Sequence, residues 1–599
     1  MLGKIAKWFT AMKKSVQSGL QRFPEAIIMA ALTTITFIAL NHIEQATFDT
    51  DRYDGVVDIL GNLGMVLALG VAAFLVKSVL FERFRDKIWA NHVISRPLSV
   101  ILILALLTTY YFTLQADTDF VTGARYAALS ASLYLIFLFL PYFWRRAHFE
   151  KYVLFVLLRF AITYLFASII VGGFSAIILT IDALFPINIA GQLLPDVALV
   201  AFGIFAPIFF LSYIPKFEED MEPVEYVSFL RILLAYIVMP ILAIYTLVLI
   251  VYLLSILIST SWPKGIVSNM VLWFSLISTF ILFITYPIRE MNRWTTLFWR
   301  FFPMFLIPML LMMFVAVGIR INAYGVTESR YIVVALGIWL FASMVYLSIG
   351  RNIRNIWLPI TFVIFLIVSV FSPVNLFFVS KDSQNDRLEK ILSKYEMLEN
   401  GKFIKLPKSE IDKISESDRE QIKAIFSYFY ENHDVKDIRS VPSEFRLANS
   451  MDYFGYIWYG NQFYDETGKT QSYNHYLKSV EIVDVENYDS FIDFNNYNGE
   501  NKTFKIGDLQ IEYVSMSQNL RLTKNEVEIG NIEVRELAKE VHKKHKGKDQ
   551  LSLQQMTSVF ENEEVKLNIQ FTSIFGMSDA AAKEITVDSA SFYLLIDRK

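Results

Sequence analysis

Long uncharged hydrophobic runs dominate the chain up to about residue 380, and short charged segments separate them. Eleven windows of at least 18 residues contain no Asp, Glu, Lys or Arg. Because a helix needs about 20 mostly apolar residues to cross a bilayer, each window predicts one transmembrane helix. The windows are 26–43, 59–76, 97–116, 126–144, 160–181, 197–215, 232–263, 265–288, 301–319, 331–350 and 355–380.

The window 232–263 is the one whose length is ambiguous. At about 1.5 Å per residue it is too long for one upright helix, yet too short for two helices and a turn. Pro240 lies inside it, and a proline bends a helix by removing a backbone hydrogen bond. We therefore predict a single kinked or tilted helix here, which gives eleven spans in total.

The stretch Arg354–Ile391 marks the change from a lipid-solvated to a water-solvated chain. No charged residue lies between its first residue and Lys381. Pro373 is expected to end the last span, and polar residues follow it before an amphipathic helical pattern begins. The predicted domains are therefore a transmembrane bundle over residues 23–380 and a soluble domain over residues 381–599.

Helix and strand patterns both occur in the predicted soluble domain. One amphipathic helix is expected from Arg387 to about Leu398, and a second follows Ser417-Asp418-Arg419-Glu420, which is typical of a capping box. Apolar residues then alternate with polar ones, which predicts strands. A further helix is expected near Val534–His545. The strand patterns lie at Tyr488–Phe494, Phe504–Val514, Val565–Phe571 and Ser591–Ile596.

The predicted fold class is a polytopic α-helical membrane bundle, with about eleven transmembrane helices, followed by a C-terminal soluble α+β domain. Of the 599 residues, 54% are hydrophobic and 15% are aromatic, which excludes a soluble enzyme of ordinary composition. The net charge of −3 conceals 26 basic and 20 acidic residues up to position 380, but 29 and 38 after it. Cysteine is absent, which excludes disulfides and thiolate chemistry.

Basic residues predict how the chain is oriented in the membrane. Residues 1–22 have apolar positions every three or four residues among four lysines, which suits an interfacial helix on an anionic cytoplasmic leaflet. Alternate loops collect 21 basic residues on that side and 5 on the other, as the positive-inside rule requires. The N-terminus is thus expected in the cytoplasm, and residues 381–599 outside the plasma membrane.

Common catalytic and cofactor-binding motifs are missing from the sequence. It has no Walker-type phosphate loop, no His-Glu-x-x-His zinc motif and no Gly-x-Ser-x-Gly nucleophile elbow. No catalytic residue, cofactor or metal is therefore predicted, and no nucleic-acid partner. His542 and His545 could form half a metal site, but Lys543, Lys544 and Lys546 accompany them. Because cations repel a metal ion, we interpret this helix face as a solvated basic surface.

Four ionisable residues near membrane depth are candidates for function, because an uncompensated charge in hydrocarbon is costly. They are Asp58, Arg159, Asp182 and Asp196. A transport pathway would place them around a polar cavity. Side chains that extend to the membrane interface would need no such cavity. The sequence leaves both interpretations open.

Two acidic clusters suggest further hypotheses. Asp49, Asp51 and Asp54 resemble the acidic outer loop of polytopic lipid-linked sugar transferases, but the loop here is short, so this enzyme hypothesis is the weaker one. The cytoplasmic turn Glu218–Glu222 could recruit a basic protein partner, or pair with arginines of the neighbouring inner loop. We favour a solvated loop as the simpler interpretation of this turn.

Two segments resemble a bacterial family of multi-pass membrane proteins known as domain of unknown function forty-one fifty-three. Their match covers roughly residues 285–405 and implies a bacterial envelope protein with no established activity. The first segment is similar to the family's pattern Arg-Ile-x-x-Tyr-Gly-x-Thr-Glu-x-Arg-Tyr, which places its polar cluster at Arg320, Tyr324, Gly325, Thr327, Glu328, Arg330 and Tyr331. The second comprises Pro373, Val379-Ser380, Ser383-Gln384, Arg387-Leu388-Glu389, Leu392 and Gly401-Lys402.

The first of these segments forms the predicted hairpin between the ninth and tenth spans. Gly325 can adopt the positive φ of a turn, and Thr327 can cap the next helix. Arg330 lies at the wrong end of that helix for a cation, so it needs compensation. We hypothesise that Glu328 pairs with Arg320, while Arg330 reaches a carboxylate on another outer loop or on the soluble domain. The alternative is a purely local ion pair that shapes the turn.

Two functions follow from these predictions. The leading one is an integral plasma-membrane protein of transporter or channel type, with an extracytoplasmic regulatory or binding domain. The alternative is a non-transporting envelope sensor or assembly scaffold, whose bundle is an anchor. Membrane-depth charges that face one cavity would favour the first, and a solidly packed bundle the second. Expected partners are the lipid bilayer and a protein at the outer domain or at the acidic turn.

Overall fold

The computed structural model divides the chain into two compact units. Unit 1 comprises Met1–Arg387 and Tyr428–Asp437, and unit 2 comprises Leu388–Ser427 and Ile438–Lys599. The structure describes all residues except 1–15, 47–53, 85–86, 88–93, 115–119, 144–147, 186–189, 216–227, 260–265, 351–352, 406, 412, 444, 446–449, 455, 460–461, 466–469, 479–482, 487, 495–501, 515–518, 526, 547 and 580–583.

Three expectations from the sequence fall on these excluded residues. Most of the predicted interfacial helix 1–22 lies outside the described part, although residues 16–22 are helical. The acidic turn Glu218–Glu222 lies wholly outside it. Of the acidic outer loop, Asp49 and Asp51 are likewise outside, whereas Asp54 begins a helix.

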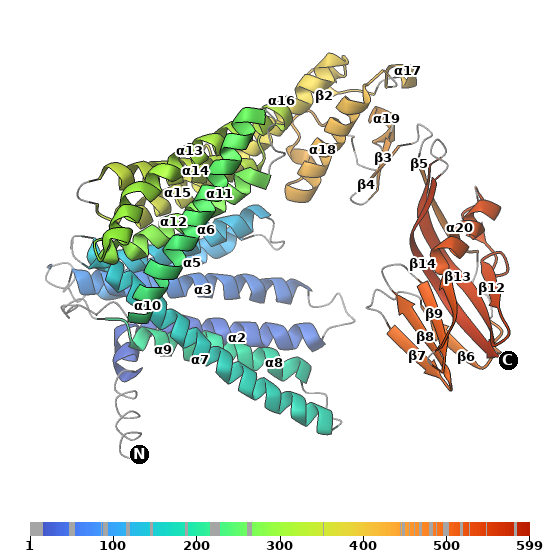
Figure 1. Ribbon diagram of the computed structural model, residues 1–599, viewed down its shortest axis with the longest axis horizontal. Helices are drawn as coiled ribbons and strands as arrows, with labels where there is room; N and C mark the ends of the chain where they lie inside the picture. Colours follow the sequence, from blue (N-terminus) through green and yellow to red (C-terminus); the bar gives the residue numbers. More distant parts are fainter. Residues whose placement is uncertain are drawn as a thin grey trace. The chain divides into compact units, whose positions relative to one another are not determined.

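Unit 1 is a bundle of long helices, drawn in Figure 1. Its elements are α2 (Pro24–Ala46), α3 (Asp54–Arg83), α5 (Ser95–Thr113), α6 (Phe120–Phe139), η1 (Leu140–Tyr142), α7 (Phe149–Leu184), α8 (Ala190–Val200), η2 (Ala201–Phe205), α9 (Ala206–Ser212), α10 (Ser228–Ile232), η3 (Leu233–Val238), α11 (Met239–Ser259), α12 (Ile266–Thr285), η4 (Tyr286–Ile288), α13 (Arg293–Tyr324), α14 (Glu328–Ile349), α15 (Trp357–Phe371) and the first part of α16 (Leu376–Lys394), up to Arg387.

Among the described residues, ten helices are long and apolar enough to cross a membrane, and an eleventh span results if α15 and α16 are joined across their bend of 45°. The prediction of about eleven membrane-spanning helices is therefore confirmed. The ambiguous window forms one candidate span, Ser228–Ile256, in agreement with the prediction. A π-helical segment, η3, lies within it just before Pro240. Such segments widen the helix locally and relieve the strain of irregular hydrogen bonding.

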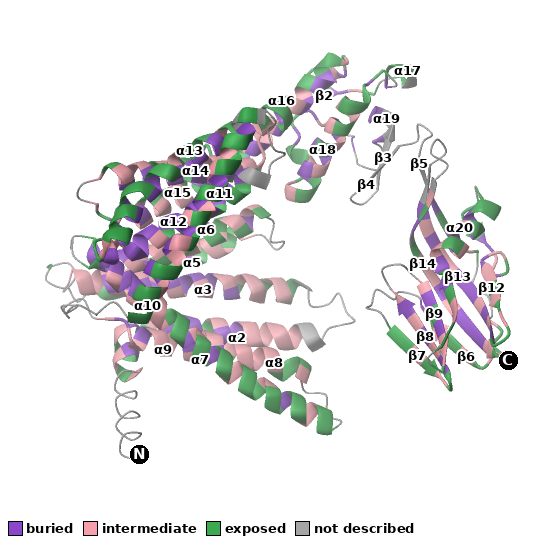
Figure 2. Ribbon diagram, viewed as in Figure 1, coloured by how far each residue is buried: buried purple, intermediate pink, exposed green. Residues whose placement is uncertain are grey.

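The interior of unit 1 is apolar. Its largest core cluster draws on α7 and α11–α15, where Leu306, Leu310, Leu340 and Met344 are fully buried. Outward-facing leucines and isoleucines of the same helices are exposed, as lipid-solvated side chains are in the absence of a membrane. In Figure 2 buried residues concentrate along α12–α14, whereas exposed residues cover much of α7. The helices thus pack tightly on one side and face lipid on the other.

The bend between α15 and α16 has a local cause. Pro373 follows the end of α15, and Asn375 then restarts the helix, because its Oδ1 accepts hydrogen bonds from the backbone N–H groups of Phe377 and Phe378 at 3.0 and 2.9 Å. Asparagine is a favoured N-cap for this reason. The polar residues expected after Ser380 therefore continue a helix rather than a loop.

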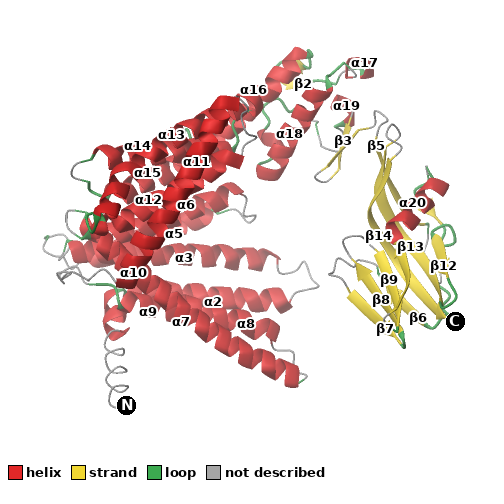
Figure 3. Cartoon of the chain, viewed as in Figure 1, coloured by secondary structure: helices red, strands yellow, loops and turns green. Residues whose placement is uncertain are grey.

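Unit 2 contains short helices and four small sheets, shown in Figure 3. Elements in and next to this unit are β1 (Leu398–Glu399), β2 (Lys402–Phe403), α17 (Lys408–Ile411), α18 (Glu416–Asn432), η5 (Val435–Asp437), α19 (Met451–Phe454), β3 (Tyr456–Tyr459), β4 (Gln462–Asp465), β5 (Thr470–Leu477), β6 (Ser490–Asp493), β7 (Lys502–Ile506), β8 (Leu509–Val514), β9 (Asn519–Lys524), β10 (Val527–Glu533), α20 (Val534–Lys544), β11 (Gln550–Leu551), β12 (Thr557–Glu561), β13 (Val565–Asp579) and β14 (Glu584–Arg598).

Two sheets and one helix build the core of the C-terminal region. A four-stranded antiparallel sheet has the order β10-β9-β8-β7, and a six-stranded sheet has the order β11-β5-β13-β14-β6 with β12 paired to β13. Alternate residues of β8 and β13, including Ile511, Leu567 and Phe571, are fully buried. Helix α20 contributes Val534, Ala538 and Val541 to the same core. The predicted combination of strands and a helix in this region is confirmed.

The prediction for His542 was wrong. Its side chain is 3% exposed, so it is not part of a solvated basic surface. The His542 Nδ1 lies 2.9 Å from Nε2 of His475, which is 1% exposed, and the Tyr473 ring stacks on the His542 imidazole at 3.5 Å. Val534, Ala538 and Val541 share the buried face of α20 with His542, whereas its lysines lie on other faces.

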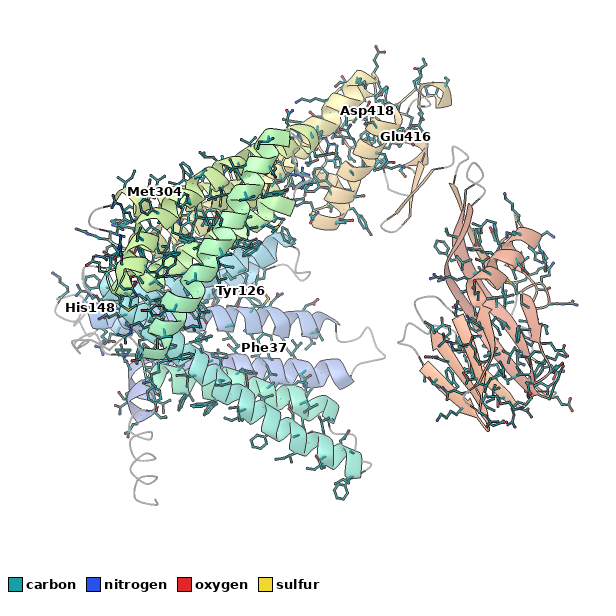
Figure 4. All side chains as sticks on the ribbon, viewed as in Figure 1. Phe37, Tyr126, His148, Met304, Glu416 and Asp418 are labelled. Atoms are coloured by element: carbon teal, nitrogen blue, oxygen red, sulfur yellow. The ribbon has the colours of Figure 1, made fainter. Side chains whose placement is uncertain are left out.

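The N-cap of α18 is Ser415, two residues earlier than the predicted capping box at Ser417, and the backbone N–H of Ser415 donates to the Tyr395 hydroxyl at 3.0 Å rather than to a side chain of the helix. Figure 4 labels Glu416 and Asp418 in the first turn of this helix. The Ser415 Oγ accepts from the Asp418 N–H at 3.2 Å and donates to the Asp418 carboxylate at 2.9 Å. Lys394 and Tyr395 donate to the same carboxylate at 2.6 and 2.7 Å. These donors, Lys394 first, hold the pKa of Asp418 below its usual value.

Candidate functional site

The hairpin between α13 and α14 forms a tight turn that requires glycine. Gly325 has a φ of 69°, and its N–H donates to the Ile321 carbonyl at 2.8 Å. A Cβ at this position would lie 2.9 Å from Nε2 of Gln384 and 3.2 Å from Oγ of Ser383. Both the backbone conformation and the close approach of α16 therefore exclude a side chain here.

The first part of α16 binds the exposed carbonyls of this hairpin. Gln384 donates through Nε2 to the carbonyls of Tyr324 and Val326 at 3.1 and 2.8 Å. Arg387 donates to the Tyr324 carbonyl at 3.1 Å, and the Val326 N–H donates to Ser383 Oγ at 2.9 Å. The two sequence segments that carry the family resemblance thus meet in space. We call these residues, with Glu328, Tyr428 and His433, the hairpin cluster.

Arg330 is bound locally, but not by an ion pair. Its guanidinium donates to the carbonyls of Tyr324 and Gly325 at 3.0 and 2.6 Å. The hypothesis that it reaches a distant carboxylate is therefore wrong for the described part of the chain. Backbone carbonyls at the turn supply the compensation that the cation needs. Tyr331, one residue further, donates to the Val374 carbonyl at 2.8 Å, which ties α14 to the break before α16.

Glu328 makes the long-range contact instead. Glu328 is 6% exposed, and its Oε1 accepts a hydrogen bond from Tyr428 at 2.5 Å. His433 Nε2 lies 2.7 Å from the same oxygen and 2.9 Å from the Tyr428 hydroxyl. The hypothesis that Glu328 pairs with Arg320 is thus replaced by a contact 100 residues along the chain. Thr327 occupies the N-cap position, but its hydroxyl contacts Ser329 rather than capping the helix.

The directions of the hydrogen bonds around Glu328 follow from its surroundings. Burial first, and then the adjacent carboxylate, raise the pKa of Tyr428 far above its ordinary value, so its hydroxyl remains a donor. A carboxylate only accepts, so His433 directs an N–H from Nε2 toward it. Glu328 is also the first residue of α14, where the helix dipole favours negative charge. Glu328 Oε1, the Tyr428 hydroxyl and His433 Nε2 therefore lie within hydrogen-bond distance of one another.

Further contacts hold the segment Tyr428–Asp437 against α16. Lys381 pairs with the Asp437 carboxylate at 3.2 Å, and Asn385 donates to the Asp437 carbonyl at 3.1 Å. The ring of Phe377 packs edge-on against the His433 imidazole at 6.5 Å. This segment is consequently part of unit 1, although the chain on both sides of it belongs to unit 2.

The four membrane-depth candidates have separate neighbours. Asp196 on α8 accepts from His42 at 2.7 Å and from Asn41 at 3.2 Å. Asp182 on α7 accepts from the Ala190 N–H at 3.4 Å. Arg159, also on α7, lies over the rings of Tyr213 and Phe155 at 4.8 and 5.0 Å, and Asp58 is half-buried on α3. None of these contacts links one of the four candidates to another.

Sequence reasoning missed Tyr428 and His433. The apolar face predicted for α18 included Ile422, Ile425, Phe426 and Phe429, which are all buried. Tyr428 follows Ile425 at helical spacing but was not included in that face, and His433 follows the end of the helix. The sequence offered one signal for these partners. Glu328 has no lysine or arginine three or four residues away along the chain, so its carboxylate had to find a partner elsewhere. No group of three His, Cys, Asp or Glu that could hold a metal occurs among the residues the structure describes.

The fold and the site define a polytopic helical membrane protein with a C-terminal region of several β-sheets. The chain belongs to the family described as "Domain of unknown function (DUF4153)", which matches residues 27–396. It is similar to an uncharacterized protein of Pasteurella multocida (strain Pm70), at 22% identity over 352 residues, which cover 57% of this chain and 60% of that protein. The chain therefore spans less than two thirds of this relative's length. No solved structure matches.

Proposed function

We propose that this chain is a non-transporting sensor or assembly scaffold of the bacterial plasma membrane. The observation that carries the proposal is the buried hydrogen bonding of Glu328, at the start of a membrane helix, with Tyr428 and His433. Glu328 is only 6% exposed, and a buried carboxylate is unfavourable without its hydrogen-bond donors, so the contact requires both donors to be in place. The contact therefore favours one arrangement of α14 and the segment Tyr428–Asp437.

The covalent path makes this contact suited to signalling. The segment Tyr428–Asp437 is flanked by Leu388–Ser427 and Ile438–Lys599, both of unit 2. A displacement of the start of α14 would therefore pull on two separate stretches of that unit. Conversely, a ligand or protein partner bound to unit 2 could change the position of the segment. A sensor needs this mutual coupling, in which a change at either site affects the other.

Glu328→Gln is the experiment that tests this function. The amide keeps the size of the side chain but removes the negative charge to which Tyr428 and His433 donate, so these hydrogen bonds should weaken. In native membranes the variant is expected to increase protease cleavage within residues 428–437 and in the stretches on either side. Glu410→Gln, which changes an exposed carboxylate in unit 2, is the matched control and should leave the cleavage pattern unchanged. An unchanged pattern in Glu328→Gln would contradict the sensor proposal.

Transport is the second candidate, because one observation favours it. His42 and Asp196 form a hydrogen-bonded acid–base pair between α2 and α8, with the carboxylate 18% exposed and Asn41 as a further donor. Pairs of this kind in membranes often carry protons. In proteoliposomes with an internal pH dye, wild-type protein should show no proton flux above empty vesicles if the sensor proposal holds. A flux that His42→Gln and Asp196→Asn both abolish would establish transport instead.

The orientation of the chain is part of the proposal. The 21-to-5 distribution of loop basic residues supports a cytoplasmic N-terminus and an extracytoplasmic C-terminal region. Because the chain has no cysteine, Glu563→Cys introduces a unique thiol at an exposed turn between β12 and β13. We expect a membrane-impermeant maleimide to label it in intact cells to the same extent as in lysed cells. Labelling that requires lysis would reverse the predicted orientation.

A further inference from the structure

A polar cavity of about 580 Å³ lies at the opposite end of α14 from the hairpin cluster, where α7 and α15 begin. This volume is in the usual range for small-molecule sites. His148, labelled in Figure 4, precedes α7 and lines the cavity. Phe149, Glu150, Lys151, Arg354, Asn355 and Trp357 also line it.

Two hydrogen-bond acceptors lie at the buried side of this cavity. Glu150 is 9% exposed and Asn355 is 1% exposed, and Asn355 Nδ2 donates to Glu150 Oε1 at 2.7 Å. The carboxylate can only accept, so this orientation of the amide is the chemically required one. It leaves the Asn355 Oδ1 buried, with no hydrogen-bond partner among the described residues. A buried acceptor without a donor is unfavourable, which points to a ligand that supplies N–H or O–H groups.

The backbone around Asn355 is held by its neighbours, and the hydrogen bond to Glu150 orients its side chain. The Arg354 N–H donates to the Tyr346 hydroxyl at 2.7 Å, and the Tyr286 hydroxyl donates to the Ile353 carbonyl at 3.2 Å. The Asn355 carbonyl accepts from the Leu358 N–H at 3.1 Å as α15 begins. The acceptors are therefore held in place before a ligand arrives.

Cations lie at the more accessible side of the same cavity. Lys151 is half-buried and Arg354 is exposed, and both line it. Buried acceptors next to accessible cations are complementary to a zwitterion whose ammonium points inward and whose phosphate points outward. A purely anionic headgroup would place negative charge near the Glu150 carboxylate, which is repulsive at short range. A quaternary ammonium has no N–H to donate, so it would leave the Asn355 Oδ1 unpaired.

A second, apolar cavity of about 270 Å³ adjoins the polar one. Phe149 lines both, and consecutive residues of α15 divide between them. Trp357 and Ile360 line the polar cavity, whereas Leu358, Pro359 and Phe362 line the apolar one. The apolar cavity continues between α6, α7, α12 and α14 at Leu135, Leu157, Leu276 and Trp339. A ligand that fills both spaces must have a polar head and a hydrocarbon tail.

We infer that these two neighbouring cavities together bind a phospholipid with a phosphoethanolamine headgroup. The primary ammonium donates to Glu150 and to the Asn355 Oδ1, the phosphate lies near Lys151 and Arg354, and part of an acyl chain enters the apolar cavity. The predicted orientation puts this site in the cytoplasmic leaflet. No residue of the site belongs to the hairpin cluster, so the inference does not depend on the proposed sensor function.

Lipid titration of the purified, delipidated full-length chain tests this inference. In detergent, native mass spectrometry would compare dioleoyl phosphatidylethanolamine, phosphatidylcholine and phosphatidylglycerol. We expect the ethanolamine lipid to bind about tenfold more tightly than the choline lipid, because sites built for a donor discriminate strongly against ligands that lack it. Equal binding of these two lipids, or tighter binding of the glycerol lipid, would overturn the assignment without any variant being needed.

Variants separate the two parts of the site. Glu150→Gln should reduce the preference for ethanolamine over choline to about one, since a neutral amide no longer attracts the ammonium. Glu290→Gln, which alters an exposed carboxylate, is the matched control and should keep the preference. Leu135→Trp should weaken diacyl lipid binding by narrowing the apolar cavity, while glycerophosphoethanolamine binding stays constant. If the soluble headgroup displaced the intact lipid at equal concentration, the acyl part of the inference would be wrong.

Discussion

His433→Leu is expected to destabilise the packing of the segment Tyr428–Asp437 against α14 and α16 by about 2–4 kcal/mol. The leucine removes the Nε2 donor that lies 2.7 Å from the buried Glu328 oxygen and supplies nothing in its place. Tyr428 remains as a donor, but one bond does not replace two to a carboxylate in a dry site. Hydrogen exchange measured by mass spectrometry on the full-length chain in nanodiscs should show faster exchange of residues 428–437.

The double variant Glu328→Gln with His433→Leu makes this prediction specific. In the double variant, the Glu328 charge that would have lost its His433 donor is itself absent. The double variant should therefore destabilise the segment by less than the sum of the two single effects. Lys436→Gln is the control on the same segment, since its side chain is almost fully exposed. Additive effects of the two substitutions, measured as opening free energies, would show that Glu328 and His433 do not act together.

The sequence predicted the membrane helices well because the solvent restricts their composition. Each span must satisfy its backbone internally and expose apolar side chains to lipid, so uncharged windows locate the helices directly. The turn at Gly325 was predictable for a related reason, since a positive φ in a hairpin selects glycine locally. Both features depend on interactions within a few residues or with the solvent.

The partners of Glu328 and Arg330 could not be deduced in the same way. Arg330 is satisfied by the carbonyls of Tyr324 and Gly325, which every peptide unit offers and no sequence pattern marks. Glu328 bonds to side chains at positions 428 and 433, whose proximity depends on how α16 continues past Pro373. Charge complementarity suggested Arg320, but the buried carboxylate is bound by the hydroxyl of a tyrosine and the imidazole of a histidine.

The error at His542 has a different origin. Its neighbours at 543, 544 and 546 are lysines, and composition suggested an exposed surface. Helical periodicity gives the opposite answer, because residues 534, 538, 541 and 542 follow the three- and four-residue spacing of one face. The buried residues at these positions show that periodicity outweighs the average polarity of a short segment.

Acidification is expected to destabilise the C-terminal β region through this same histidine. Burial first, then His475 and Lys546, lower the pKa of His542 to about 4. Burial also lowers the pKa of His475, whose Nδ1 lies 2.7 Å from the Lys548 carbonyl. In the unfolded chain a histidine has a pKa of about 6.5. Between these values the unfolded state binds more protons, so stability is complete above about pH 6.5 and decreases as the pH falls toward 4.

The expected loss between pH 7.5 and pH 5 is on the order of 1–2 kcal/mol, because protonation of the buried His475–His542 pair places a charge where the His542 Nε2 has no hydrogen-bond partner among the described residues. Hydrogen exchange of β5 and α20 in the full-length chain, corrected for the intrinsic pH dependence, would measure this change. His542→Leu should reduce the pH dependence, since a leucine does not titrate. His545→Gln changes the neighbouring, less buried histidine and should leave the slope as it is. If His542→Leu retains the full acid sensitivity, another group on these sheets must be responsible.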